Sequence, residues 1–108
     1  MFEKEYTVNI DGLKVSGTAN KILELSKIFE HAIDDCRSTQ SMLITAYNSG
    51  SLSDEHLIDS IKEEERQLIK INDQLIRTIQ DDEYYKQYIS ERNQIVAKFL
   101  AKIHHNEH

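Results

Sequence analysis

The stretch SDEHLIDSIKEEERQLIKINDQLIRTI, residues 53–79, is the longest part of the chain with one unbroken helical pattern. Ser53 is a good N-cap, because its hydroxyl can accept a hydrogen bond from an unpaired N–H of the first turn. Apolar residues then recur at three- and four-residue spacing, which is typical of an amphipathic helix. We therefore predict a helix at 53–80. Its stripe is expected to form the interface of a homo-oligomer through Ile58, Ile61, Leu68, Asn72, Leu75 and Ile79.

Two polar residues interrupt this stripe. Asn72 is either partly exposed at its edge, or buried so that it fixes the register or the oligomer state of the helices at some cost in stability, as a polar residue in a coiled-coil seam does. Glu65 is expected at a rim or a splayed end, because an unpaired buried carboxylate is very costly. The stripe is also broader than a two-helix seam, so the helix should touch more than one neighbour.

Residues 1–17 are predicted to form a β-hairpin. Apolar and polar residues alternate on both sides of the dipeptide Asp11-Gly12. A two-residue Asp-Gly loop favours a type I′ turn, whose twist suits a hairpin. Such a loop puts four apolar side chains on one face in two pairs, Ile10 with Leu13 and Val8 with Val15.

A second helix is predicted at 18–49. Thr18 is a fair N-cap, and Gly50 can take the left-handed conformation that often follows the end of a helix. The segment 37–41 lacks apolar anchors and strong helix formers, so the helix is expected to bend or break there.

A third helix is predicted at 82–104, after a turn capped by Asp81 or Asp82. Extending the stripe of 53–80 beyond its end would place mostly polar residues on it, which favours a turn. The alternative is one long helix that uses two faces against two partners. Residues 105–108 are expected to be a frayed tail.

The fold class is therefore mainly α (α+β): a β-hairpin followed by three amphipathic helices in one domain, residues 1–108. A helix of 27 residues is about 40 Å long at ~1.5 Å per residue. A compact chain of this length has a radius of gyration of only about 13 Å. The molecule should be elongated, and exposed apolar stripes favour a coiled-coil-like helical bundle of several chains.

Charge is spread unevenly along the chain, whose net charge is −6. Residues 51–83 carry 4 basic and 10 acidic side chains, whereas residues 84–108 carry 4 and 2. The acidic balance argues against nucleic acid as the main partner, because phosphate binding draws on clustered Lys and Arg. With no long apolar run and a single cysteine, we expect no membrane span and a cytoplasmic location. The excess of Ile and Lys fits an A/T-rich bacterial or phage genome.

No catalytic motif is present. His31 and Asp35 are four residues apart on a predicted helix, but two ligands are too few for a tetrahedral zinc site. A helical enzyme with a metal site around them is the third and weakest hypothesis, and Cys36 is expected in the core. The chain has no Walker A loop, and Glu63-Glu64-Glu65 fits no magnesium-binding spacing, so we predict no cofactor and no metal.

Two functional hypotheses remain. The first is a non-enzymatic, acidic, helical homo-oligomer that binds another protein, as a small inhibitor or adaptor from a phage or other mobile element. The second is an oligomer that binds or sequesters a small nucleotide-like ligand between its chains, since Arg and Tyr suit phosphorylated ligands. The residues expected to hold that ligand are Arg66, Arg77, Arg92, Tyr84, Tyr85 and Tyr88.

Overall fold

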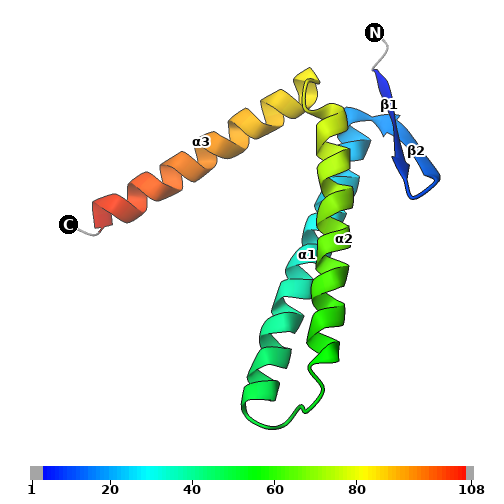
Figure 1. Cartoon of the computed structure of the whole chain (residues 1–108). Helices are drawn as coiled ribbons and strands as arrows, with labels where there is room; N and C mark the ends of the chain where they lie inside the picture. The colour runs from blue at the N-terminus through cyan, green and yellow to red at the C-terminus, as the bar shows by residue number, and fades with distance from the viewer. Residues whose placement is uncertain (1–3, 107–108) are drawn as a thin grey trace.

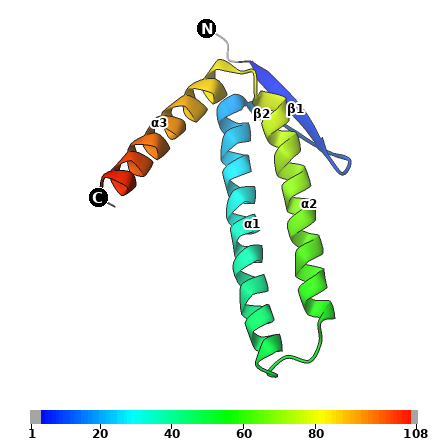
Figure 2. The same ribbon diagram turned by 60° about the vertical axis from the view of Figure 1, so that its left-hand side comes forward.

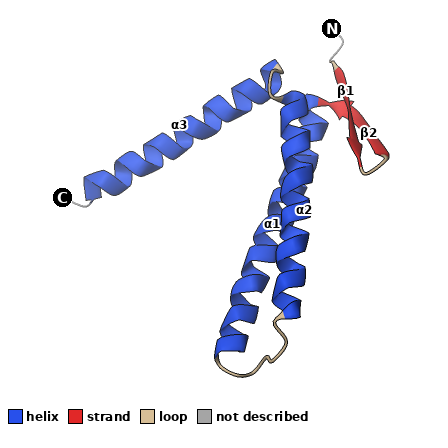
Figure 3. Ribbon diagram, viewed as in Figure 1, coloured by secondary structure: helices blue, strands red, loops and turns tan. Residues whose placement is uncertain are grey.

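The computed structural model describes residues 4–106. It contains a two-stranded hairpin followed by three helices, as Figures 1 and 3 show. The elements are β1 (Glu5–Ile10), β2 (Leu13–Thr18), α1 (Ala19–Asn48), α2 (His56–Ile79) and α3 (Glu83–Asn106). The predicted layout of a hairpin and then three helices is confirmed.

The molecule is flat and open. Helices α1 and α2 lie antiparallel and form a long arm, the hairpin lies beside the upper end of this arm, and α3 leaves that end in another direction (Figures 1 and 2). The radius of gyration is 18.6 Å and the extents are 60 × 53 × 14 Å. A compact chain of this length would have a radius of gyration of about 13 Å. The prediction of an elongated chain is confirmed.

The β-hairpin has the predicted register. Its strands pair antiparallel, with Ile10 opposite Leu13 and Val8 opposite Val15. The turn residues Asp11 and Gly12 both have positive φ, 50° and 89°, as a type I′ turn requires. Val8 is buried against the helices, so the apolar face of the hairpin covers the upper end of the arm.

Helix α1 begins and ends where its sequence predicts. The Thr18 hydroxyl accepts a hydrogen bond from the N–H of Lys21, and Gly50 beyond the far end has a φ of 82°. The helix is unbroken through 37–41, so the expected break is wrong, and a bend there stays a prediction. Two side chains from this segment bond across to α2, which supplies the anchoring that apolar residues do not: Arg37 and Gln40.

Helix α2 begins at His56, three residues later than predicted, and Ser53 is not its N-cap. The segment before α2 is held to the last turns of α1 instead, because the N–H of Leu52 donates a hydrogen bond to the carbonyl of Ala46 at 3.1 Å. The Asp54 carboxylate instead accepts a hydrogen bond from the N–H of His56 at 2.9 Å. An acidic side chain is therefore still placed at the positive end of the helix dipole.

The core lies where the upper halves of α1 and α2 meet the hairpin. Its centre on α2 is Leu75 and Ile79, both 0% exposed, which contact Ile22 and Leu23 of α1. Below this point the arm has few fully buried side chains, so it is held by a narrow seam. The core members are Val8, Ala19, Ile22, Leu23, Leu75 and Ile79.

Polar contacts set the register of the arm. The Ser26 hydroxyl, which is fully buried, donates a hydrogen bond to Oδ1 of Asn72. Further down, Glu65 accepts hydrogen bonds from Arg37 at 2.7 Å and Gln40 at 3.3 Å. Glu65 thus lies half-buried beside the exposed side chain of Arg37, and its carboxylate is paired, which agrees with its expected place at a rim. Sliding α1 by one turn would leave these groups without partners.

The turn between α2 and α3 is confirmed, with Asp82 as the capping residue. Its carboxylate accepts a hydrogen bond from the N–H of Tyr84 at 2.9 Å. Helix α3 then continues to Asn106, two residues beyond its predicted end at 104, so the first two residues of the expected frayed tail are helical. Residues 107 and 108 of that tail lie outside the described part of the chain.

Candidate functional site

The first turns of α3 and the residue that caps them, residues 82–89, are here called its root. Contacts between residues far apart in the sequence fix this root to the rest of the chain. The Tyr6 hydroxyl of β1 donates a hydrogen bond to the Asp82 carboxylate at 2.7 Å. The Tyr84 hydroxyl donates one to Asn20 of α1 at 3.0 Å. The bond to Asp82 also raises the pKa of Tyr6 above its ordinary value. These contacts set the direction in which α3 leaves the arm.

A tyrosine pair packs the first turns of α3 against the core. The rings of Tyr85 and Tyr88 are half-buried, and their centroids are 6.5 Å apart. The ammonium group of Lys27 lies 4.8 Å from the centroid of the Tyr88 ring, a cation–π distance. Burial raises the pKa of Tyr85, against the nearby charge of Arg92. The root of α3 is therefore ordered by packing as well as by hydrogen bonds.

Beyond this root α3 has no cover. All side chains from 90 to 105 are exposed, and five of them are large and apolar. The most open are Ile95, at 68%, and Phe99, at 63%. An exposed apolar row of this length on one helix typically marks an interaction surface. We call it the α3 stripe: Ile95, Val96, Phe99, Leu100 and Ile103.

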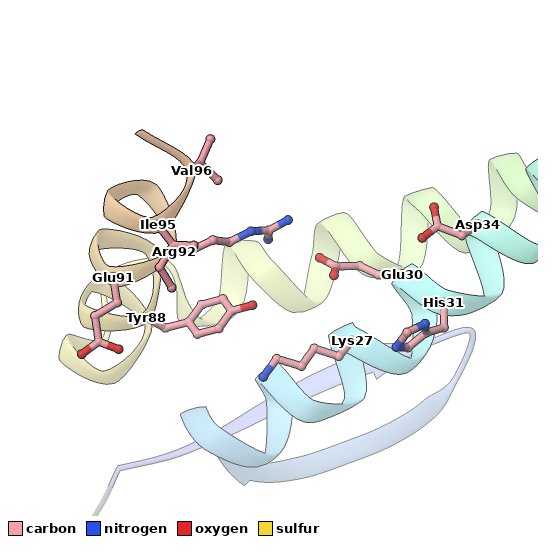
Figure 4. A pocket seen from close by; sticks show the side chains of 9 residues that line it. All are labelled: Lys27, Glu30, His31, Asp34, Tyr88, Glu91, Arg92, Ile95 and Val96. Carbon is pink, nitrogen blue, oxygen red and sulfur yellow. The ribbon is translucent and has the colours of Figure 1, made fainter. Parts of the chain in front are cut away.

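A groove of about 600 Å³ separates the first half of α3 from α1. In Figure 4, Tyr88 and Arg92 point from α3 toward α1, where Glu30 and Asp34 lie. The lining of the groove contains three carboxylates and two permanently cationic groups, so the groove is slightly acidic. It is lined by Lys27, Glu30, His31, Asp34, Tyr88, Glu91, Arg92, Ile95 and Val96.

The six residues predicted to hold a nucleotide-like ligand are not brought together. Tyr88 and Arg92 line the groove, but Tyr84 is at the root of α3 beside another hollow. Arg66 is on α2 and pairs with Glu63 of the same helix. Tyr85 faces the core, and Arg77 lies on α2. Within one chain, only two of the six share a site.

The predicted oligomer interface on α2 is largely used within the chain. Leu75 and Ile79 belong to the core, Ile58 is buried, and Asn72 bonds to Ser26. Ile61 and Leu68 keep part of their surface. Association of chains stays a prediction, but Leu75 and Ile79 have no surface left to offer to it.

Two titratable side chains of the arm, Glu65 and Cys36, have pKa values that are shifted by their surroundings in the fold. Hydrogen bonds from Arg37, and then from Gln40, hold the pKa of Glu65 below its ordinary value. Cys36 is buried, and that burial raises the pKa of its thiol, which disfavours the reactive thiolate. Within residues 4–106, no group of three or more His, Cys, Asp or Glu side chains could hold a metal ion, and that includes the surroundings of His31 and Asp35.

Sequence reasoning missed the groove and the isolation of α3. The acidic side chains Glu30 and Asp34 look like an ordinary solvated helix face, and nothing in the sequence brings them near α3. The apolar spacing of the α3 stripe was visible, but a buried helix would show the same spacing. The signal that separates the two cases is the direction of α3, which long-range contacts determine.

Comparison of the chain with known protein families, with characterised proteins and with solved structures gives no match. Within residues 4–106, no helix has the length and apolar character needed to cross a membrane.

Proposed function

We propose that this chain is a non-enzymatic, acidic, helical homo-oligomer that binds another protein, acting as a small inhibitor or adaptor. Helix α3 is the surface through which its chains assemble, and the arm of α1 and α2 is the part offered to the other protein. The observation that carries the proposal is the α3 stripe, a row of large apolar side chains on a helix with no cover from residue 90 to 105.

The energetics of the stripe favour assembly. Burying one large apolar side chain is worth about 1.5–3 kcal/mol. Covering half of each of the five stripe residues on two chains would then contribute about 8–15 kcal/mol. Association costs about 4–15 kcal/mol in lost freedom. The surplus is modest, so the proposal predicts assembly that depends on concentration. Assembly also stabilises α3 itself, because most of the stability of a helix in a protein comes from the packing of its apolar face.

The far end of the arm suits a basic protein partner. Its exposed acidic side chains include Glu55, Asp59 and Glu64, none of which has a basic partner within salt-bridge distance in the described chain. Leu57 is exposed among them and can contribute apolar contact area. Clustered charge of one sign speeds the encounter with an oppositely charged partner and makes its rate depend on salt.

Light scattering across a range of concentrations tests the assembly. The proposal predicts a particle mass above the 12.6 kDa of one chain, falling toward it on dilution. A mass of one chain even near 1 mM, where an interaction of about −4 kcal/mol would be visible, contradicts it.

Partner binding is tested by capture from a bacterial lysate at low and high salt. We expect a protein that is retained at low salt, released at high salt, and lost when Glu55, Asp59 and Glu64 are changed to Gln, Asn and Gln. The control changes Glu5 and Glu24, two exposed acidic residues away from the far end of the arm, to Gln. Equal loss in both variants would place the binding elsewhere on the acidic surface.

A second candidate, binding of a small nucleotide-like ligand, has one observation in its favour. The groove between α1 and α3 has a volume in the range of small-molecule sites, and Tyr88 and Arg92 line it. Its three carboxylates oppose a phosphate group, so we rank this candidate second. A rise in melting temperature with a nucleotide, abolished in Arg92→Gln, would support it; no shift with any nucleotide would remove it.

A further inference from the structure

We infer that α3 pairs in antiparallel orientation with the α3 of a second copy of this chain, so that Ile95 lies beside the partner's Ile95. The inference rests on the proposed assembly and names the element, orientation and register through which it occurs. It is carried by the spacing of the apolar residues on α3, by their exposure, and by the charges beside them.

The apolar face of α3 has the spacing of a coiled-coil seam. The residues along its centre follow one another at steps of four, three, four, three and four, as the a and d positions of a heptad do. These are Tyr85, Ile89, Arg92, Val96, Phe99 and Ile103. Tyr88 and Ile95 flank the seam on one side, and Leu100 on the other. From residue 92 onward every one of these side chains is exposed, so no part of residues 4–106 occupies the seam there.

One antiparallel register satisfies the whole seam. In it the two helices overlap over residues 85–103, and each a position meets a d position of the other copy. The inner pairs are Ile89 with the partner's Phe99 and Arg92 with the partner's Val96. At the ends of the overlap, the partner's Ile103 meets the part of Tyr85 that packing against the core leaves exposed. The centre of symmetry is then level with residue 94, and Ile95 lies on the flank shared with its own copy, only two residues or about 3 Å away from it in height.

Charge selects the antiparallel orientation over the parallel one. Residues 92–105 carry three permanently basic side chains and no carboxylate. A parallel pair would run this basic segment along itself and put two copies of Arg92 against each other inside the seam. The antiparallel pair instead brings the partner's Lys102 beside the ring of Tyr88, and the partner's Lys98 to the level of Glu91.

The groove against α1 fits this arrangement. The flank of α3 that carries Tyr88 and Ile95 is the one that lines the groove, with Glu30 and Asp34 on the opposite wall. In the antiparallel pair, the lysines of the partner helix enter on this same side, since like flanks of the two helices face one another. The slightly acidic groove thereby receives the most basic part of a second chain, and the uncovered apolar side of Ile95 is closed.

Thiol cross-linking with a short bismaleimide tests the register. Cys36 is first changed to Ala, so that each variant carries one cysteine. Ile95→Cys is predicted to yield a covalent dimer. Gln94→Cys, at the same height but on the opposite side of α3, is the matched control and should give only background at equal maleimide reactivity. Both side chains are exposed, so neither change disturbs the core.

A third variant, Ile103→Cys, identifies the competing arrangement. In the antiparallel pair the two copies of residue 103 lie near opposite ends of the overlap and do not cross-link, whereas a parallel pair brings them together. Cross-linking at 103 and not at 95 overturns the inference while leaving oligomer formation intact. An oligomer that cross-links at neither position shows that α3 contacts another part of the partner copy, which also overturns it. A protein that light scattering shows to be one chain removes the proposed function itself.

Discussion

The hydrogen bond between Ser26 and Asn72 gives a quantitative test of how the arm is held together. The Ser26 side chain is 0% exposed, and its hydroxyl donates to Oδ1 of Asn72 across the seam between α1 and α2. The perturbation is a double-mutant cycle made of Asn72→Ala, Ser26→Ala and the two changes together. It separates the worth of this one contact from the packing around it.

The two single changes should differ in cost. Asn72→Ala leaves the buried Ser26 hydroxyl without its partner, and an unsatisfied buried polar group costs about 1–3 kcal/mol. Ser26→Ala leaves only a half-buried amide that can still reach water, so we expect about 0.5–1.5 kcal/mol, the net worth of an ordinary hydrogen bond. In the double variant, the Ser26 hydroxyl that Asn72→Ala alone would leave unpaired is itself absent. The loss in free energy of unfolding should therefore be smaller than the sum of the two single losses by about 1 kcal/mol.

Urea unfolding of the four proteins measures these differences, at one fixed protein concentration because association adds to apparent stability. Single losses that add to within about 0.3–0.5 kcal/mol would refute the contact as an energetic unit. The apolar pair Ser26→Ala with Asn72→Leu is an informative companion. It should restore stability, because replacing both partners of a buried hydrogen bond can be nearly neutral.

Three further predictions concern Glu65, Tyr6 and the α3 stripe. Glu65→Gln should lower the free energy of unfolding at neutral pH. The difference from wild type should vanish as pH falls through the lowered pKa of Glu65, because a carboxyl with a depressed folded-state pKa stabilises the fold only while it is ionised. Chemical unfolding at a series of pH values measures this difference, and a difference that persists in acid would contradict the prediction. Tyr6→Phe removes the hydrogen bond to Asp82, so at pH values below about 10 it should lower the melting temperature. The difference from wild type should shrink as pH rises through the raised pKa of Tyr6. An unchanged melting temperature at neutral pH would show that this bond does not hold the root of α3. Val96→Asp should reduce the mass seen by light scattering to that of one chain, while Gln94→Asp should leave it unchanged, because only the first change puts a charge in the exposed stripe; equal effects would point to charge rather than position.

The sequence predicted those parts of the fold that are decided locally. The hairpin follows from Asp11-Gly12 and the alternation around it, and the turn before α3 follows from the loss of apolar phase and a capping carboxylate at Asp82. Both depend on residues within a few positions of one another. The expected break at 37–41 was wrong because its anchors are on another helix, at Glu65, and no local pattern reports them.

The candidate site was less accessible to sequence reasoning. An apolar stripe shows that a face is buried but not by which chain, so the stripe of α2 was assigned to an oligomer although α1 covers Leu75 and Ile79. For α3 the opposite holds: its stripe is uncovered because Tyr6 and Tyr84 fix the direction of the helix from its root. Contacts across more than sixty residues decide which stripe is free.

Hydrogen exchange of α3 as a function of protein concentration tests most directly whether another chain covers this helix. The amides of residues 90–105 are predicted to exchange rapidly in dilute protein and to become protected as concentration rises. Amides of the core segment around Ile22 should stay protected throughout, because the arm is held within one chain. Equally rapid exchange of residues 90–105 at concentrations where light scattering shows oligomers would contradict the account, since the chains would then be assembling through a different surface.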